Sequence, residues 1–514
     1  MQADAWIKRM VTVWPSLPFA ALGFILAWNM LAFTGAVWVS SPDVDSIYRK
    51  QQYILSNSAF GLTLLAFALF SKRFAPFLEK SRSAVLGGAV SLVGSAAIIL
   101  VGPYFFSVEL ASVVGPIGVQ ILYYTGCVLA GAGNALVVEK CAELYGSVLP
   151  RNTIVHAAQA TITAIALYFI ATGFPDWRYS GSGPLVIGVG AFLTLPLLGG
   201  VLASLAKHSP EARFQAHGHS EQPDIPRPFW RMVIVLALLS FASAMVAGYA
   251  DATVPLADSS RYASLGILLQ IPVSLLFVAF AAAYHPERHN FGRIFTAILV
   301  ILAFAIALAA TTGRYIPAFY QILPFASHVF AFTVRCVLFF LIFQRQASSP
   351  VIFGYGYGLY TLADSVGWFV GSILFPELPI TVTIGVSVAL AFLSLASAFL
   401  LFSSKDFDDL FESQEQGRET LSSLMERRLD SGVTTDTHRG KFRVAIDIVA
   451  DEYGLSRREK DVLRHLAMGH DATRIAEELG VSWNTVRTHT RNLYGKLDVH
   501  SKQELAALVD SYRS

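Results

Sequence analysis

Charged residues are scarce in this chain. Asp, Glu, Lys and Arg make up only 14% of its 514 residues, against roughly a quarter in an ordinary soluble protein, whereas apolar residues reach 54%. The scarcity is not uniform, because residues 405–514 hold 17 of the 38 Lys and Arg and 20 of the 36 Asp and Glu. This distribution excludes a single soluble globular protein and predicts a membrane unit followed by a soluble unit.

Cysteine is also rare. Cys127, Cys141 and Cys336 lie far apart and form no C-x-x-C pair, so neither a disulfide framework nor a zinc site is expected. The sequence lacks a P-loop, a nucleophile elbow and a zinc-binding helix, and its histidines in "AKHSPEARFQAHGHS" and "YHPERHN" are expected to be solvated loop residues. We therefore expect no catalytic site, no cofactor and no bound metal, and we do not expect an enzyme.

Long apolar runs fill the first 404 residues. A membrane-spanning helix needs about 20 mostly apolar residues, and the first run, near Leu17–Val39, is too long for the core of a signal peptide. Twelve runs qualify as candidate spans: residues 17–39, 53–70, 84–101, 112–137, 153–172, 184–205, 230–250, 263–283, 292–311, 317–342, 351–374 and 380–402.

The long polar stretch Ala206–Pro228 divides these spans into six and six. With the N-terminus placed in the cytoplasm, the inner loops, counted with Lys140 among them, hold 15 Lys and Arg and the outer loops hold 5. Positive charge concentrates on the cytoplasmic side of membrane proteins. We therefore expect a multi-pass protein of a bacterial cell membrane with both termini in the cytoplasm, where DNA is found.

The polar segment 405–440 is expected to be a cytoplasmic linker. Its scattered apolar residues have helical spacing interrupted at Gly417, which favours a partly helical linker and leaves a dimerising coiled coil as the alternative. An apolar helix face returns through Phe442, Ile446, Val449 and Ala450. We therefore place the start of a second domain near residue 441 and its end at residue 514.

Helix-start signals recur in this second domain. Ser456 with Glu459 and Ser501 with Glu504 are S-x-x-E capping boxes, in which a hydroxyl and a carboxylate cap early backbone N–H groups. Asp471 and Ser482 are further N-cap candidates, and Gly469 and Gly480 end the helices before them. Four helices are expected around one small core, formed by Val462, Leu463, Leu466, Ile475, Ala476, Leu479, Val486, Leu493, Leu497, Leu505 and Leu508.

Two of these helices, Ala472–Leu479 and Trp483–Lys496, are joined by "GVS" and predict a helix–turn–helix. Val486 and Leu493 are seven residues apart and face inward. An arginine on the opposite face can bond O6 and N7 of guanine together in the major groove. The outward face of the second helix carries Asn484, Arg487, Thr488 and Arg491.

The stretch "LSRREKDVLRHLAMGHDATRIAEELGVSWNTVRTHTRNLYGKLDVHSKQEL" resembles the LuxR-type helix–turn–helix of bacterial transcription regulators. The resemblance implies base contacts from Arg487, Thr488 and Arg491, and phosphate contacts near Asn484, Thr485 and Lys496. It also implies a homodimer that pairs through Ser501–Val509, where Leu505 and Leu508 share a helix face; either both fill the core or one faces the partner. Arg474, in "DATRIA", stands where the family usually has Glu, which puts the phosphate contacts of that helix in doubt.

Six spans, a cytoplasmic loop and six more spans resemble the major facilitator fold. The loop "SKRFAPFLEKSRSAVLGG" keeps the basic residues of the transporters' usual motif but lacks its early Gly and its Asp, which argues against active transport. The combination with the LuxR-type end resembles membrane-bound LuxR regulators of some gut actinobacteria, whose membrane halves are taken to be sensors. The expected fold class is all-α: a twelve-helix bundle and a four-helix DNA-binding domain.

Ionisable residues deep in a span are costly and usually functional. Asp364, in the eleventh span, is expected to face a central cavity between the two six-helix halves, with Arg335 of the tenth span below it. The two could instead form a buried structural pair, and Arg335 could extend toward the cytoplasmic surface. Polar amides in the spans are expected mainly to join helices by hydrogen bonds. Asp364 and Arg335 are therefore the candidate ligand-sensing residues.

These observations predict a membrane-bound one-component transcriptional regulator. Its expected partners are operator DNA, the lipid bilayer, an unidentified small-molecule ligand and a second copy of the chain. A secondary transporter with a fused regulatory domain is the main alternative. A membrane anchor that binds no ligand is a third interpretation.

Overall fold

In the computed structural model the chain divides into two compact units, Met1–Gln414 and Glu415–Ser514. No strand occurs among the described residues, which confirms the all-α class. The described residues are 2–33, 42–101, 107–173, 183–210, 225–253, 266–283, 291–312, 322–345, 347–401, 410, 446, 449–450, 452–467, 470, 475–476, 483–497, 499, 501, 504–505 and 508.

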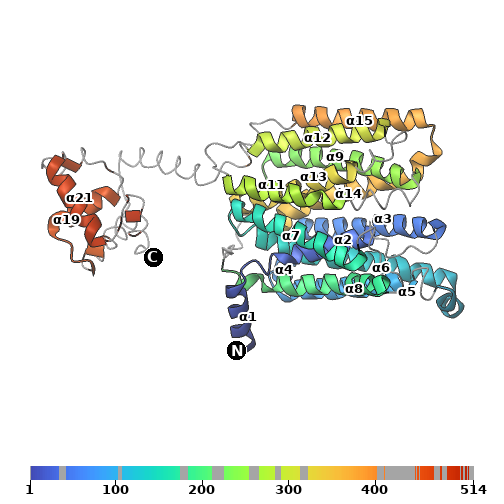
Figure 1. The fold of residues 1–514 in the computed structure, drawn as a ribbon, viewed down its shortest axis with the longest axis horizontal. Helices are drawn as coiled ribbons and strands as arrows, with labels where there is room; N and C mark the ends of the chain where they lie inside the picture. The colour runs from blue at the N-terminus through green and yellow to red at the C-terminus, as the bar shows by residue number, and fades with distance from the viewer. Residues whose placement is uncertain are drawn as a thin grey trace. The chain divides into compact units, whose positions relative to one another are not determined.

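The first unit contains helices at all twelve positions predicted as spans. In the described part, nine helices are long and apolar enough to cross a membrane, and three shorter apolar helices occupy the remaining positions. Helices α2–α8 and helices α9–α15 gather as two groups of roughly aligned helices (Figure 1). The helices at these positions are α2 (Ala20–Phe33), α3 (Pro42–Leu69), α5 (Arg82–Val101), α6 (Ser107–Tyr145), α7 (Pro150–Thr172), α8 (Gly183–Ser204), α9 (Arg227–Thr253), α11 (Gln270–Ala283), α12 (Phe291–Thr312), α13 (Ile322–Arg345), α14 (Ser349–Phe369) and α15 (Ile380–Leu401).

The outer surface of this unit is apolar. Ile117, Phe304 and Phe392 are 71%, 68% and 67% exposed, whereas many smaller apolar side chains of the same unit are fully buried. A soluble protein rarely exposes so many large apolar side chains together. Helices satisfy their own backbone hydrogen bonds, which is the condition for lying against lipid.

Three helical features were not predicted. A separate helix, α1 (Gln2–Val13), precedes the first apolar helix, and a short helix, α4 (Ser71–Leu78), lies between α3 and α5. At the end of α14, the chain continues through a π-helical turn (Val370–Leu374) and a short 3-10 turn (Phe375–Glu377). The eleventh span is therefore not one regular helix.

Helix α6 extends to Tyr145, beyond the predicted span end at residue 137. Lys140 was counted as an inner-loop charge, but it lies inside this helix and is only 3% exposed. Its ammonium donates to Glu143 Oε2 at 2.5 Å and to the carbonyl of Leu78 at 3.3 Å. The helix tolerates the buried charge because the end of α4 and a neighbouring carboxylate satisfy its donors.

Glycines allow α14 to pack closely on both sides. A Cβ at Gly354 would approach the carbonyl oxygen of Leu64 in α3, and one at Gly367 would overlap the carbonyl oxygen of Phe241 in α9. Close backbone approach of this kind is typical of small residues in membrane helices. Helix α14 thus joins α3 of the first group of helices to α9 of the second.

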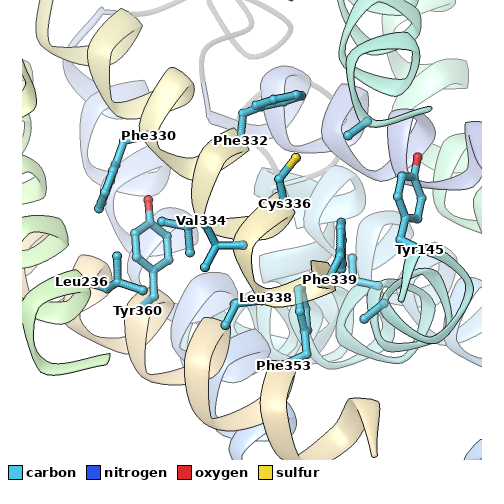
Figure 2. Packing of buried hydrophobic residues seen from close by; sticks show 14 of the residues in the cluster. Tyr145, Leu236, Phe330, Phe332, Val334, Cys336, Leu338, Phe339, Phe353 and Tyr360 are labelled. Atoms are coloured by element: carbon cyan, nitrogen blue, oxygen red, sulfur yellow. The ribbon is translucent and has the colours of Figure 1, made fainter. Parts of the chain in front are cut away.

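A ladder of aromatic rings fills the core between α6, α13 and α14. Tyr145 stacks on Phe339 with ring centroids 4.9 Å apart, Phe339 on Phe353 at 5.5 Å, and Phe353 on Tyr357 at 4.9 Å. Figure 2 shows Tyr145, Phe339 and Phe353 in this packing, together with Tyr360. Offset aromatic stacking adds to the apolar burial of these side chains.

The second unit is built around α19 (Arg457–Ala467) and α21 (Trp483–Leu497). All the predicted core residues described here are buried or packed against the core, and Leu479 lies outside the described residues. Ile446 and Val449, from the expected face of the first helix, are 0% exposed and belong to the same core. The unit therefore has its own hydrophobic core, separate from that of the membrane unit.

Candidate functional site

The first capping box forms as the sequence predicts. Ser456 N donates to Glu459 Oε2 at 2.8 Å, and Glu459 N donates to Ser456 Oγ at 3.4 Å. In the second box, Glu504 N donates to Ser501 Oγ at 3.1 Å. These contacts fix where the helices begin. The other predicted caps and helix ends (Asp471, Ser482, Gly469 and Gly480), as well as Phe442 and Arg474, lie outside the described residues.

Lys496 connects the end of α21 to the start of α19. Its ammonium donates to Glu459 Oε2 at 2.8 Å and to the carbonyl of Gly454 at 3.1 Å. The hydrogen bond from Lys496 is the main reason that the pKa of Glu459 falls to about 2. Lys496 was predicted to contact phosphate; in this structure its ammonium also orients α21 within the domain.

One face of α21 is buried and the opposite face is exposed. Val486 and Leu493 are 0% exposed and lie in the core. Arg487, Thr488 and Arg491 are exposed, on the face that the sequence predicted to read DNA. Thr485 is partly buried, and Asn484 lies in the first turn of α21, although its side chain is outside the described part. The helix thus presents two arginines and a threonine from a rigid, core-anchored element.

The two predicted dimer residues differ in burial. Leu505 is 0% exposed and belongs to the core, whereas Leu508 is partly buried and packs against it. Leu505 thus fills the core of its own domain, which is one of the two alternatives that the sequence left open. Leu508 stays a predicted dimer contact.

In the membrane unit, Asp364 joins three helices. Tyr53 of α3 donates its hydroxyl to Asp364 Oδ2 at 2.5 Å, and Ser240 of α9 donates to Oδ1 at 3.5 Å. Asp364 itself lies on α14 and is partly exposed. Tyr53 belongs to the first group of helices and Asp364 to the second, so this hydrogen bond links the two halves.

Aromatic side chains surround this contact. The Tyr53 ring stacks on the ring of Trp368, with centroids 4.2 Å apart. It also meets the ring of Phe33 in an edge-to-face contact, with centroids 4.8 Å apart. Within the described part of the chain, the indole Nε1 of Trp368 is buried and has no hydrogen-bond acceptor. A buried donor without an acceptor is uncommon and calls for an explanation.

Arg335 has a different partner from Asp364. Its Nη1 donates to the hydroxyl of Tyr357 at 3.1 Å, and the residue is 8% exposed. Tyr357 and Asp364 are seven residues apart on α14, a separation of about 10 Å along the helix axis. The structure therefore supports neither an Arg335–Asp364 ion pair nor an arginine that extends to the surface. Arg335 instead forms a hydrogen bond to Tyr357, whose ring stacks on Phe353 in the aromatic ladder.

The membrane amides include helix-joining contacts of the expected kind. Ser91 of α5 donates to Asn134 of α6 at 2.9 Å. Gln159 of α7 donates to Ser16 at 3.5 Å. His328 contacts the carbonyl of Pro324, one turn earlier in its own helix, at 2.6 Å. Hydrogen bonds within the protein account for the described contacts of Gln159 and His328, whereas the amide nitrogen of Asn134 is buried without a partner among the described residues.

Two further polar contacts were not predicted. Ser349, in the first turn of α14, donates to Glu139 of α6 at 2.5 Å, which links the two groups of helices at a second point. Arg345, the last residue of α13, donates to the carbonyl of Leu410 at 3.1 Å, and Leu410 is 1% exposed. Leu410 was predicted to belong to the linker, but it packs into the core of the membrane unit.

Residues 454–509 match the GerE family, described as bacterial regulatory proteins of the luxR family. The chain is 43% identical over 60 residues to the uncharacterized transcriptional regulatory protein YhcZ of Bacillus subtilis, covering 12% of this chain and 28% of that protein. It is 34% identical over 96 residues to the HTH-type transcriptional activator RamA of Corynebacterium glutamicum, covering 18% and 34%. The chain thus spans about a third or less of these relatives. Residues 454–509, in the second unit, are a LuxR-family helix–turn–helix domain.

The membrane unit resembles solved transporters in fold. A bacterial homologue of the iron transporter ferroportin, in an outward-facing state with soaked iron, superposes with a TM-score of 0.52 and 14% identity over 75% of this chain and 98% of its own. The same kind of homologue in an outward-facing state gives a TM-score of 0.50 and 12% identity over 77% and 99%. The two-group arrangement of apolar helices expected from the sequence is confirmed. The chain joins a membrane unit that has the fold of these solved structures to a LuxR-family helix–turn–helix domain.

Proposed function

We propose that this protein is a membrane-bound one-component transcriptional regulator of a bacterial cell membrane. The membrane unit senses a small molecule, and the LuxR-type domain binds operator DNA as a homodimer. Both termini lie in the cytoplasm, and a linker that begins after Leu410 connects the membrane domain to a DNA-binding domain (441–514). The observation that carries the proposal is one chain in which a polytopic membrane unit is followed by a LuxR-family domain with an exposed arginine face.

On DNA, Arg487, Thr488 and Arg491 contact base edges in the major groove, because they occupy the exposed face of α21. Asn484 and Thr485 lie at the start of the same helix, where side chains and backbone N–H groups hold phosphate. Lys496 is exposed enough to contact a phosphate with its remaining donor while it holds Glu459. In the membrane, Asp364 is the sensing residue. Arg335, on α13, positions the ring of Tyr357, which lies on α14 together with Asp364.

Genome-wide occupancy of the full-length protein in its host tests this proposal. The double variant Arg487→Ala/Arg491→Ala is expected to lose its binding sites while its membrane level stays normal. Arg458→Ala is the matched control, because Arg458 is also an exposed arginine of this domain but lies on α19. The proposal fails if the wild-type protein occupies no discrete chromosomal sites, or if the double variant occupies the same sites as the control.

A second function, a transporter with a fused regulatory domain, is favoured by one observation. The membrane unit keeps the fold of a transporter over three quarters of the chain, with polar contacts between its two halves at Asp364 and Glu139. Uptake into vesicles separates the two functions. Accumulation of a solute that also alters promoter occupancy would establish the transporter with a regulatory domain, whereas altered occupancy without accumulation would establish the sensor.

A further inference from the structure

We propose that Asp364 binds a cationic ligand, an organic ammonium, in competition with the hydroxyl of Tyr53; this identification of the ligand class rests on the proposed sensing function. The site consists of Asp364 (α14), Tyr53 (α3), Ser240 (α9) and Trp368 (α14). We call it the Asp364 site. Its four side chains come from both groups of helices.

The charge of Asp364 is the first reason. In the part of the chain that the structure describes, no cationic side chain pairs with this carboxylate, because Arg335 contacts Tyr357. Tyr53 and Ser240 supply only neutral hydrogen bonds. A carboxylate among membrane helices is costly unless a positive charge accompanies it. Asp364 is partly exposed, and its negative charge attracts a cation and repels an anion.

The aromatic side chains are the second reason. Tyr53 lies against Trp368 at 4.2 Å and against Phe33 at 4.8 Å. The faces of such rings attract ammonium groups, and Trp attracts them best. A carboxylate bordered by aromatic rings therefore favours an ammonium over a strongly hydrated metal ion, which needs several oxygen ligands.

The indole N–H of Trp368 narrows the ligand class. This donor is buried and has no acceptor among the described residues. Trp368 is one turn from Asp364 on α14, so both side chains lie on one face of the helix. A ligand that carries a hydroxyl or carbonyl oxygen near its ammonium group would satisfy the donor. An ammonium with an adjacent oxygen is thus preferred over an ammonium without one.

The position of Tyr53 connects binding to a change in structure. Its hydroxyl donates a hydrogen bond to Asp364 Oδ2 at 2.5 Å, and the ligand's ammonium group would bind to the same oxygen. A ligand that takes this place releases Tyr53, and with it a polar contact between α3 of the first half and α14 of the second. Binding therefore weakens one of the links that hold the halves together, which is the type of differential contact that shifts a conformational equilibrium.

The test uses full-length protein in nanodiscs, with each probe titrated at several constant pH values. The probes are choline, which has a quaternary ammonium and a hydroxyl, tetramethylammonium, which lacks the hydroxyl, and acetate, which is an anion. Tryptophan fluorescence and the unfolding temperature report binding. Choline is expected to bind more tightly than tetramethylammonium, and acetate is expected to have no effect.

Three variants separate the contributions. Tyr53→Phe keeps the ring but removes the competing hydroxyl, so choline affinity is expected to increase about tenfold. Trp368→Phe is expected to weaken choline binding more than tetramethylammonium binding, because it removes the N–H donor as well as part of the attraction between the ring and the ammonium group. Asp364→Asn is expected to abolish both. The Tyr53→Phe result decides the matter even if Asp364→Asn fails to fold, since a purely structural tyrosine would not increase affinity when truncated.

The proposal is overturned if acetate stabilises the protein, if neither ammonium probe has an effect at any pH, or if Tyr53→Phe weakens choline binding. A response to pH alone would assign Asp364 to a proton and would also overturn it. A promoter reporter distinguishes failure of the ligand-binding proposal from failure of the proposed sensing function. If choline binds but transcription does not respond, the Asp364 site stands and the sensing function falls.

Discussion

Lys496 and Glu459 are 37 positions apart in the sequence, and a 2.8 Å hydrogen bond joins them. The bond connects the last turn of helix α21 to the capping box that begins α19. Glu459 is thereby both the cap of one helix and the anchor of another. The orientation of Arg487 and Arg491 depends on this contact, although neither residue takes part in it.

We expect this ion pair to make the stability of the DNA-binding domain depend on pH. The pKa of Glu459 is about 2, below its ordinary value of 4.5. The pair therefore contributes fully above pH 4.5, and the contribution is lost as the pH falls from 4.5 to about 2. Lys496→Met should cost only about 1–2 kcal/mol at pH 7, because the side chain of Lys496 is 41% exposed and solvent screens the pair. Chemical unfolding of residues 441–514 at several pH values measures this, with Arg458→Met as the control; equal acid sensitivity in both variants would contradict it.

On operator DNA, Arg487→Ala and Arg491→Ala should each weaken binding by about 1–3 kcal/mol and relax the preference at one base pair. Lys496→Ala should weaken binding to all sequences alike and reduce the salt slope by about 1. Footprinting and titration at two salt concentrations distinguish these effects. Unchanged sequence preference in both arginine variants would refute the recognition face.

The two leucines of the last helix should respond differently to substitution. Leu505→Ala leaves a cavity in the core and should destabilise the domain by about 2–5 kcal/mol. Leu508→Arg should preserve the fold and reduce the footprint to one half-site, because Leu508 is only partly buried. Circular dichroism checks folding and footprinting checks pairing. A folded Leu508→Arg variant with a full-length footprint would exclude this residue from the dimer contact.

In the membrane unit, Asp364→Asn should remove the transcriptional response to ligand while leaving the membrane level normal. The exchange variant Asp364→Arg/Arg335→Asp should not restore a response, because the two side chains have different partners about two helical turns apart. A reporter assay with immunoblotting tests both variants. Rescue by the exchange would show that the two residues form a pair in the signalling state.

Arg345 and Leu410 should couple the membrane unit to the chain that follows. Arg345→Gln, combined with Leu410→Ala, removes the hydrogen-bonding guanidinium and the buried side chain at the end of α13. We expect reporter output to become independent of ligand, with unchanged ligand-dependent stabilisation of the membrane unit. Lys207→Gln, a charge change elsewhere in the unit, should leave the response intact.

The sequence predicted the features that depend on residues close together in the chain. Span positions follow from the length of apolar runs, and the Ser456–Glu459 box follows from two residues three positions apart. The features it missed depend on distant partners: Tyr53 and Asp364 are 311 positions apart, and Glu139 and Ser349 are 210 positions apart. The charge of Lys140 made its segment resemble a loop. The sequence pattern does not show that the carbonyl of Leu78, 62 positions earlier, accepts a hydrogen bond from the Lys140 ammonium inside the helix. The sequence left open which of Leu505 and Leu508 fills the core, because two leucines on one helix face do not decide it.

The anchoring of Leu410 limits where this regulator can act. Ile446 follows Leu410 by 36 positions, and a fully extended chain covers at most about 3.3–3.6 Å per residue. The first core residue of the DNA-binding domain therefore stays within roughly 130 Å of the membrane anchor. A diffusing regulator can search the whole nucleoid, but under the proposed function this protein binds its operator only where the operator comes to the inner surface of the cell membrane. Its response time is thus set partly by the motion of the chromosome, and genes whose transcripts are translated into the membrane would be brought to it most often.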